Sequence, residues 1–248
     1  MNPNGRLPLT GERTVPDIAS ENYWFRRHEA AYRFVLPHCR AARVLDAGCG
    51  EGSGAGLIAG VADGVVAMDY DALTVAHASR RYRQLAVVLA NLVDLPVSDA
   101  AIDVVVCLQV IEHLWNQPRF LGECARVLRP GGVLILSTPN RLTFSPDWSP
   151  GTPPRNPFHS RELSPSELPL LLPRSLGPPT LLGVRHGARL GELDRCYGGL
   201  VAAQLATTPD HWPAGLPADV AGVRAEDFVI NSTGLDTALD LVLVARRR

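Results

Sequence analysis

A length of 248 residues, 46% of them hydrophobic, provides enough apolar side chain to bury one large core. The formal net charge is -1, so the chain lacks the global positive charge that attracts nucleic acid or an anionic membrane, and a polynucleotide substrate is disfavoured. No run of about 18 apolar residues is present. The first residues show no secretory pattern and the five cysteines no disulfide or zinc spacing, so we expect a reduced, cytoplasmic protein without a membrane span.

The first half of the chain alternates short apolar runs with amphipathic segments, a pattern typical of βαβ units around a parallel sheet. A helix is predicted in the segment ENYWFRRHEAAY, ahead of the first strand. Five strands are then predicted at 43–47, 64–70, 86–91, 102–108 and 133–137, with helices at 53–60, 71–83 and 117–128. We therefore expect a doubly wound α/β sheet whose ligands bind beyond the carboxyl ends of its strands.

The second half is less regular and is rich in proline. A long loop is predicted over 139–165, a length that is usually functional or disordered. A short helix is predicted over 164–172, with Ser164 as N-cap and Glu167 completing a capping box. It is followed by a strand over 180–184, a helical pattern over 189–208, a proline-rich connection over 209–222 and a last strand over 239–245. Because no repeat or low-complexity segment appears, we expect a single domain whose late loops shape a pocket.

Glycine occupies every second position from Gly48 to Gly56 in the stretch VLDAGCGEGSGAG, between the first strand and the next helix. Missing side chains let the backbone approach a ligand, and the helix N-terminus offers unpaired N–H groups. A dinucleotide-binding loop of the type G-x-G-x-x-G requires a third glycine where this chain has Ser53. Asp46 would also place a carboxylate where a pyrophosphate binds. The loop therefore favours a positively charged ligand, such as one carrying an ammonium group, over NAD.

The segment VLDAGCGEG resembles the first motif of the Rossmann-like S-adenosylmethionine-dependent methyltransferases, in which an acid precedes G-x-G-x-G. Further similar segments follow in the family's order: Asp69 at the end of the second strand, then ANLVDLP, DVVVCLQVIEHLWN and RVLRPGGVLILSTPN. The resemblance covers about residues 43–140. It implies a seven-stranded, mostly parallel sheet with helices on both faces.

This resemblance implies S-adenosylmethionine as the cofactor. Asp46 and the glycines are then expected to hold its methionine part, Asp69 its two ribose hydroxyls through charge-assisted hydrogen bonds, and Asn91 its adenine. The family usually has Asp at this last position, so Asn91 keeps a carbonyl acceptor but loses the charge. The cofactor-binding residues implied in this segment are Asp46, Gly48, Cys49, Gly50, Gly52, Asp69, Tyr70, Asn91, Leu92 and Gln109.

Four longer segments extend the resemblance: TGERTVPDIASENYWFRRHEAAY, QVIEHLWNQ, STPNRLTFSP and NPFHSREL. Together they are similar to mycobacterial methyltransferases associated with polymethylated polysaccharides, including methylglucose lipopolysaccharide. This implies a sugar hydroxyl as acceptor, on a small molecule or an oligosaccharide. Within one domain we predict an N-terminal arm and lid over 1–36, a cofactor-binding core over 43–140 and an insertion over 188–225 that shapes the acceptor site. The oligomeric state stays open, a homodimer included.

A sugar hydroxyl is a poor nucleophile, so a base or a metal ion is expected to help remove its proton. His113 follows the fourth predicted strand, where the methyl group should point. Imidazole titrates nearest to neutral pH, so His113 is the first candidate for a general base. The alternative is a histidine that only caps a helix or closes the cofactor pocket.

The sequence QVIEH also resembles the E-x-x-E-H motif of divalent-metal-dependent O-methyltransferases that act on RNA ends and on quinone precursors. A later histidine completes the site in those relatives, and His159 in NPFHSREL is the matching candidate. The implied ligands of a cation such as Mg²⁺ are Glu112, His113 and His159. Gln109 replaces the first acid of that motif, and a neutral amide is a poorer ligand for a hard cation. Alternatively, His159 anchors its loop through a hydrogen bond.

Other side chains are candidates for ligand contact. Tyr23 and Arg27 are four residues apart on one predicted helix face, and Arg27 could pair with the methionine carboxylate, or the helix could simply dock on the core. His186, flanked by arginines, could line the acceptor pocket or belong to a solvated basic turn. Trp148 and Trp212 lie in predicted loops and could stack on a sugar face or only pack.

Two other functions are alternatives to sugar methylation. One is a metal-dependent O-methyltransferase of a quinone-like phenol or an RNA terminus, although the near-neutral charge argues mildly against RNA. The other is a non-catalytic adenosylmethionine-binding module, which would never form adenosylhomocysteine.

Overall fold

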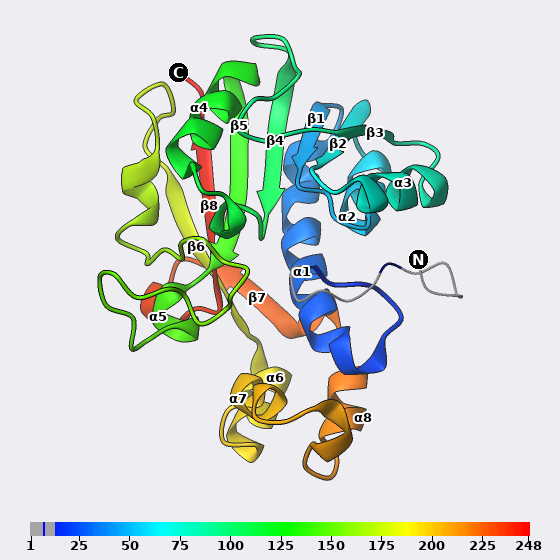
Figure 1. Cartoon of the computed structure of the whole chain (residues 1–248), viewed down its shortest axis with the longest axis vertical. Coiled ribbons are helices and arrows are strands. Elements are labelled where there is room, and N and C mark those ends of the chain that lie inside the picture. The colour runs from blue at the N-terminus through cyan, green and yellow to red at the C-terminus, as the bar shows by residue number, and fades with distance from the viewer. Residues whose placement is uncertain (1–6, 8–12) are drawn as a thin grey trace.

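Parallel strands form one side of the sheet in the computed structural model, which describes Leu7 and residues 13–248 (Figure 1). They are β1 (Arg43–Ala47), β2 (Gly64–Asp69), β3 (Ala86–Leu89), β4 (Ile102–Leu108) and β5 (Leu128–Pro139). Their order is β3-β2-β1-β4-β5, so the strand order reverses between β1 and β4. Parallel sheets bind ligands at such a reversal. The five strands predicted here are confirmed, and β5 begins earlier than expected, at Leu128.

The sheet continues beyond β5 with antiparallel pairing. The strands are β6 (Thr180–His186), β7 (Phe228–Asn231) and β8 (Asp240–Arg246). β8 pairs with both β5 and β6, and β7 pairs with β6 at the edge. The sheet of the described residues therefore has eight strands, and the expected number of seven is wrong. The additional strand β7 is four residues long and partly exposed, so its sequence lacks the long apolar run that marks a buried strand.

Helices cover both faces of the sheet and connect its strands. Asp71 caps α3 by accepting a hydrogen bond from a backbone amide, which fixes the helix start after β2. The helix predicted over 164–172 is only a 3-10 turn at Leu168–Leu171, although the Glu167 carboxylate accepts the Ser164 N–H as predicted for a capping box. The α-helices of the described residues are α1 (Asn22–Cys39), α2 (Ser53–Ala59), α3 (Ala72–Arg81), α4 (Gln117–Val127), α5 (Arg141–Phe144), α6 (Ala188–Cys196), α7 (Leu200–Leu205) and α8 (Leu216–Ala221).

The sheet separates two layers of apolar core. Successive side chains of a strand point to opposite faces. Val104 and Val106 of β4 belong to the layer that contains α1 and α2, whereas Val105 and Cys107 belong to the layer that contains α4. Because β4 is covered on both sides, the apolar run IDVVVCL is buried almost throughout, and the loop that follows it starts from a rigid base.

The helices α6, α7 and α8 lie together at the lower end of the molecule in Figure 1, beyond the sheet. They fall within 188–225, the segment predicted to shape the acceptor site. The single helical pattern predicted over 189–208 is interrupted, because Gly198 and Gly199 have φ values of 65° and 114°, which an α-helix does not allow.

Helix α1 packs on the sheet and forms one wall of the cleft described below. Ala31, Val35 and Cys39 are buried in the core, while Phe25 and His28 line the cleft. Whether this wall acts as a lid stays a prediction, and residues 1–6 and 8–12 of the predicted arm lie outside the described part of the chain. Among the described residues, no helix has both the length and the apolar character needed to span a bilayer.

Candidate active site

A cleft of about 1180 Å³ opens at the carboxyl ends of the parallel strands. Its lining comes from α1, the glycine loop after β1, the end of β2, the loop after β3 and the segment after β4. Pro157 and Phe158, from the long loop that follows α5, complete one side. A cleft of this size can hold a nucleoside cofactor together with part of a second substrate.

The glycines after β1 serve different purposes. A Cβ on Gly48 would lie 2.3 Å from Val110 Cγ2, and a Cβ on Gly54 would lie 2.1 Å from the Tyr32 ring, so these two allow close packing within the protein. A Cβ on Gly50 would meet no atom of the described residues within 4 Å, and Gly50 lines the cleft. The sequence leads us to expect open space for a ligand beside the whole glycine run, but only Gly50 of these three has it. At Gly48 and Gly54 a glycine is needed because a neighbouring side chain occupies the space of a Cβ.

Asp46 lies at the end of β1, fully buried, and is not among the lining residues of the cleft. The Tyr32 hydroxyl donates to its carboxylate, at 3.3 Å from each oxygen, and Tyr32 itself lines the cleft. Burial raises the pKa of Asp46 to about 7, against the lowering effect of the Tyr32 hydrogen bond. The geometry therefore gives no support to direct contact between Asp46 and the methionine part of the cofactor. The same holds for Gly52, which faces the Tyr82 ring, whereas Cys49 does line the cleft.

Asp69 closes β2 and lines the cleft beside Gly50. Its Oδ2 accepts the Gly50 N–H and its Oδ1 accepts the Asp71 N–H, both at 3.0 Å. Burial raises the pKa of Asp69, while the hydrogen bonds from Asp71 and Gly50 work in the opposite direction. The structure thus places the predicted ribose acceptor next to the open position of the glycine loop.

Three further predicted cofactor residues line the same part of the cleft: Tyr70, Asn91 and Leu92. The side-chain oxygen of Asn91 accepts the Val93 N–H at 3.1 Å, which fixes the turn after β3. A carbonyl oxygen has two lone pairs, so Asn91 can still accept a second hydrogen bond from a ligand.

Gln109 follows β4 and also lines the cleft. Its φ is 58°, a left-handed conformation that is strained for a residue other than glycine. The Gln109 N–H donates to the Ser137 carbonyl at 2.9 Å, and its side-chain amide donates to the Ser137 hydroxyl at 3.1 Å. Strain of this kind clusters at functional sites, which agrees with the predicted role of Gln109.

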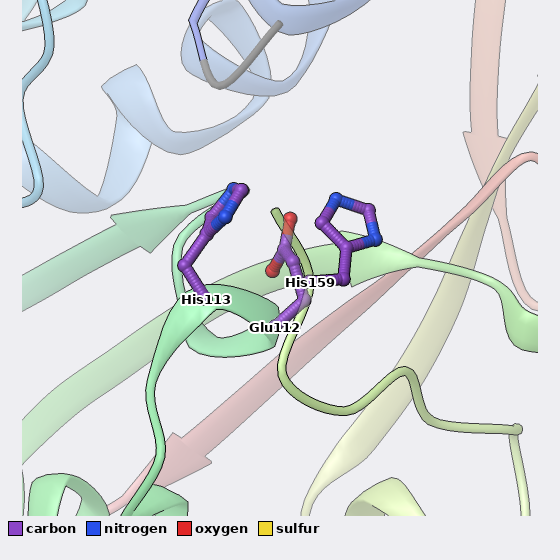
Figure 2. A group of neighbouring side chains, drawn as sticks. All are labelled: Glu112, His113 and His159. Carbon is purple, nitrogen blue, oxygen red and sulfur yellow. The ribbon is translucent and has the colours of Figure 1, made fainter. Parts of the chain in front are cut away.

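Glu112, His113 and His159 converge next to this segment (Figure 2). Glu112 and His113 belong to the 3-10 turn Ile111–His113 after β4, and His159 belongs to the long loop after α5. One nitrogen or oxygen atom from each side chain lies within 4.8 Å of the others. The two imidazole rings are nearly perpendicular, with centroids 4.9 Å apart. The structure therefore brings together the catalytic and metal-ligand candidates that the sequence suggests.

The orientation of His113 is set by a backbone carbonyl. Its Nδ1 lies 3.0 Å from the carbonyl oxygen of Phe158. Because a carbonyl oxygen only accepts, Nδ1 carries the proton, and the lone pair of the neutral ring is on Nε2. This tautomer suits a general base or a metal ligand that acts through Nε2.

Both ring nitrogens of His159 are engaged within its loop. Nδ1 lies 2.6 Å from the Glu162 carboxylate, and Nε2 lies 3.0 Å from the side-chain amide nitrogen of Asn156. The Asn156 oxygen accepts the Phe158 N–H, so the amide is oriented to donate to His159. These contacts agree with the loop-anchoring alternative for His159, and they hold Phe158 where its carbonyl can accept from His113.

Glu112 is buried, and its carboxylate accepts a hydrogen bond of 3.0 Å from the Thr138 hydroxyl. Burial raises the pKa of Glu112 to about 7, although the hydrogen bond from Thr138 lowers it. One carboxylate and two imidazoles are donors typical of zinc or iron, whereas Mg²⁺ prefers oxygen. The spacing therefore fits a divalent cation, but the donor types fit the expected Mg²⁺ poorly, and His159 would have to release Asn156 in order to bind.

Tyr23 and Arg27 share a face of α1, as predicted, but neither is among the lining residues of the cleft. Arg27 Nε lies 3.1 Å from Asp240 Oδ2, and both side chains are buried. The Tyr23 hydroxyl lies 2.7 Å from His186 Nε2, and His186 lines a separate cavity of about 500 Å³. The predicted contact of Arg27 with the methionine carboxylate gains no support from this structure and stays a prediction, because a buried carboxylate is already the partner of Arg27.

The sequence predictions miss many lining residues of the cleft, among them His28, Tyr32, Trp115 and Phe158. Burial lowers the pKa of His28 to about 3, so its ring is neutral. Trp115 and Phe158 are exposed aromatic side chains close to the ends of the His113 and His159 segments. Their nearness in sequence to those two histidines is the signal that could have identified them.

The aromatic residues that the sequence suggests for sugar stacking are engaged elsewhere. The Arg141 guanidinium lies 4.4 Å from the ring centroid of Trp148, and the Trp148 indole N–H donates to the Thr152 carbonyl. The Trp212 indole N–H donates to the Gln204 carbonyl at 3.1 Å. Both residues are absent from the lining of the cleft.

Comparisons with known proteins show which family the chain belongs to. A family described as a methyltransferase domain matches residues 45–136. A probable S-adenosylmethionine-dependent methyltransferase of Mycolicibacterium smegmatis is 52% identical over 97% of this chain and 95% of its own length. A protein of Mycobacterium tuberculosis with the same description is 51% identical over 97% of this chain and 90% of its own length.

The fold also matches a solved structure. A SAM-dependent methyltransferase from Thermotoga maritima has a TM-score of 0.62, at 17% identity, over 91% of this chain and 93% of that one. At this identity the match shows the fold alone. The mycobacterial relatives go further, because about half of their residues are identical to this chain over nearly its whole length. Because of its similarity to these relatives, the chain belongs to the S-adenosylmethionine-dependent methyltransferases.

Proposed function

We propose that this methyltransferase acts on a hydroxyl of a sugar or oligosaccharide, in the biosynthesis of a mycobacterial methylglucose or methylmannose polysaccharide. The acceptor class is supported by the four segments that resemble methyltransferases of polymethylated polysaccharides. The relatives from Mycolicibacterium and Mycobacterium are consistent with that source, although their names state no acceptor.

The observation that most supports O-methylation is the orientation of His113. In the proposed reaction the acceptor oxygen attacks the methyl carbon in line with the C–S bond, whose electron pair leaves with sulfur to give adenosylhomocysteine. The hydroxyl proton passes to Nε2 of His113, whose Nδ1 is fixed by the Phe158 carbonyl. Holding oxygen and methyl carbon in this alignment supplies much of the acceleration.

Glu112 and His159 flank this base. Proton transfer to His113 creates a positive charge, which the nearby Glu112 carboxylate stabilises when it is ionised. His159 positions the loop through Glu162 and Asn156, so its proposed contribution is to keep the Phe158 carbonyl in place.

A second version of the proposal uses a divalent cation. Glu112, His113 and His159 would hold it, and the cation when bound would make the acceptor hydroxyl more acidic. The convergence of three ligand atoms within 4.8 Å favours this version. It would suit a sugar hydroxyl or a quinone-like phenol equally well.

The test is an acceptor screen with labelled S-adenosylmethionine. Short partly methylated glucosides and mannosides, a catechol and a short RNA are each incubated with the protein, with and without a chelator, and label is measured in the acceptor. We expect label in a saccharide. Label only in the catechol or the RNA would refute the sugar acceptor, and loss of all label in the chelator, restored by a divalent cation, would select the metal-dependent version.

The same screen addresses the non-catalytic alternative. A binding module would bind adenosylhomocysteine in a calorimeter but transfer no label to any acceptor. Binding with no label in any of the three acceptor classes would therefore contradict the proposed function.

A further inference from the structure

Trp115 is 94% exposed although it lines the cleft, and Phe158, on the facing loop, is 43% exposed. Large aromatic side chains bury readily because their apolar area is costly to hydrate. Two of them exposed at the rim of a binding cleft indicate a surface that is covered by a ligand.

Both aromatic residues are tied to the proposed base. Trp115 follows His113 by two positions, and the Phe158 carbonyl accepts the His113 Nδ1 proton. Ser160 holds the two segments together: its N–H donates to the Glu112 carbonyl at 2.7 Å and its hydroxyl donates to the Leu114 carbonyl at 2.7 Å. The rim that carries the rings is therefore fixed relative to His113.

The surroundings of the rings are polar. Asn116 and His113 line the cleft beside Trp115, so an acyl chain lying there would cover polar groups without pairing them. A pyranose matches both features, because one face of the ring presents C–H bonds and its edge presents hydroxyls. The C–H face can lie on an indole while the hydroxyls reach polar side chains.

We propose that Trp115, together with Phe158, forms a stacking platform that holds a pyranose ring of the acceptor with one hydroxyl directed toward His113. This inference rests on the proposed sugar acceptor and adds the residues that select it. It replaces Trp148 and Trp212, which have partners elsewhere, as the aromatic contact with the sugar.

The test compares Trp115→Ala, Trp115→Phe and a control, Leu170→Ala, with the wild type. Leu170 is also exposed, at 83%, but it lies on the 3-10 turn Leu168–Leu171 and is not among the lining residues of the cleft. The saccharide found in the acceptor screen is titrated to obtain kcat and KM, and calorimetry measures the affinity for adenosylhomocysteine.

We expect Trp115→Ala to raise KM for the saccharide by about 10- to 100-fold, because it removes most of the apolar area on which the ring would lie. Adenosylhomocysteine affinity should change by less than about twofold, since the platform is at the acceptor side. Trp115→Phe should recover most of the loss because it keeps an aromatic face, and Leu170→Ala should match the wild type. An unchanged KM in Trp115→Ala would overturn the platform.

Saccharide binding is measured separately, as quenching of tryptophan fluorescence in the presence of adenosylhomocysteine. A saccharide that quenches the wild type but not Trp115→Phe, and is never labelled, would support the platform and contradict the proposed reaction. A wild type that labels saccharides with equal KM in all variants would overturn the platform alone. A wild type that neither binds nor labels any saccharide would overturn both.

Discussion

The two sides of the cleft are built in different ways. On the proposed cofactor side, Asp69 ends β2 and Asn91 follows the end of β3 by two residues. Each accepts a hydrogen bond from the backbone amide two residues further along the chain. On the acceptor side, His113 depends on Phe158, which is 45 residues away in the sequence. The first side is local in sequence, and the second is assembled from distant segments.

This difference shows what each side of the cleft needs in order to form. A strand end followed by a tight turn positions its side chain through nearby backbone, so it is determined as soon as the strand forms. The acceptor side needs a long loop to be anchored by Ser160, His159 and Asn156 before His113 has its orientation. The comparison predicts that substitutions on one side change one half of the reaction and leave the other half intact.

The largest effect is expected at the acceptor side. His113→Ala should lower kcat by about 100- to 10,000-fold, because the hydroxyl proton loses its acceptor. Adenosylhomocysteine affinity, measured by calorimetry, should stay within about threefold of the wild type, since the proposed cofactor contacts are on the other side. His38→Ala, at an exposed position near the end of α1, is the control. A normal rate in His113→Ala would remove the base from the mechanism.

The next prediction concerns the stability of the glycine loop where Gly48 packs against Val110. Gly48→Ala should lower the free energy of unfolding by about 2–4 kcal/mol, because its Cβ would overlap Val110 at a φ of 88°. Chemical denaturation measures the loss. Gly50→Ala is the matched variant: it also has positive φ but open space, so it should stay within about 1–2 kcal/mol of the wild type while binding adenosylhomocysteine more weakly. Equal stability of the two variants would contradict this division of roles.

A smaller effect is expected for the cofactor side. Asp69→Asn should weaken adenosylhomocysteine binding by about 10- to 100-fold, because charge-assisted hydrogen bonds to the ribose become neutral ones. KM for the acceptor should be unaffected at saturating cofactor. Asp63→Asn, just before the other end of β2, is exposed and should behave as the wild type. If Asp69→Asn changed the acceptor KM as strongly as the cofactor affinity, the two sides would not be independent.

The last effect is a dependence of stability on pH and concerns Asp46, beneath the cleft. Its pKa is raised from 3.8 to about 7 by burial, so the folded protein binds an additional proton between these values. The free energy of unfolding should therefore fall as pH rises from about 4 to about 7, with a slope from this group of up to about 1 kcal/mol per pH unit. Asp46→Asn should flatten that slope, and Asp210→Asn, at an exposed position, should not. Denaturation at several pH values measures both, and an unchanged slope in Asp46→Asn would show that Asp46 is ionised throughout.

The parallel core could be predicted from the sequence because its signals are local. Each strand is an apolar run covered on both faces, and each turn after a strand carries its own polar or glycine residues, as at Asp69 and Asn91. The short edge strand β7 could not be predicted, because four partly exposed residues carry too little pattern. The interruption near Gly198 was visible as a glycine pair but was outweighed by the helical spacing around it.

The site divides in the same way. Similarity of motifs to known methyltransferases identified Glu112, His113 and His159 together, and the structure does bring them close. Helical spacing also showed that Tyr23 and Arg27 share a face, but it could not show toward which side of α1 that face turns. Only the position of Asp240, on the last strand, decided that Arg27 is paired away from the cleft.

By itself, the sequence of this protein determined a parallel α/β core, a glycine loop with an acid before it and the side chains that follow each strand, because those features depend on neighbours a few residues away. The tertiary structure decided the tautomer of His113, the occupied nitrogens of His159, the partner of Arg27 and the exposure of Trp115. Each of these depends on segments far apart in the chain, and their meeting is set by the packing of the whole fold rather than by any local pattern.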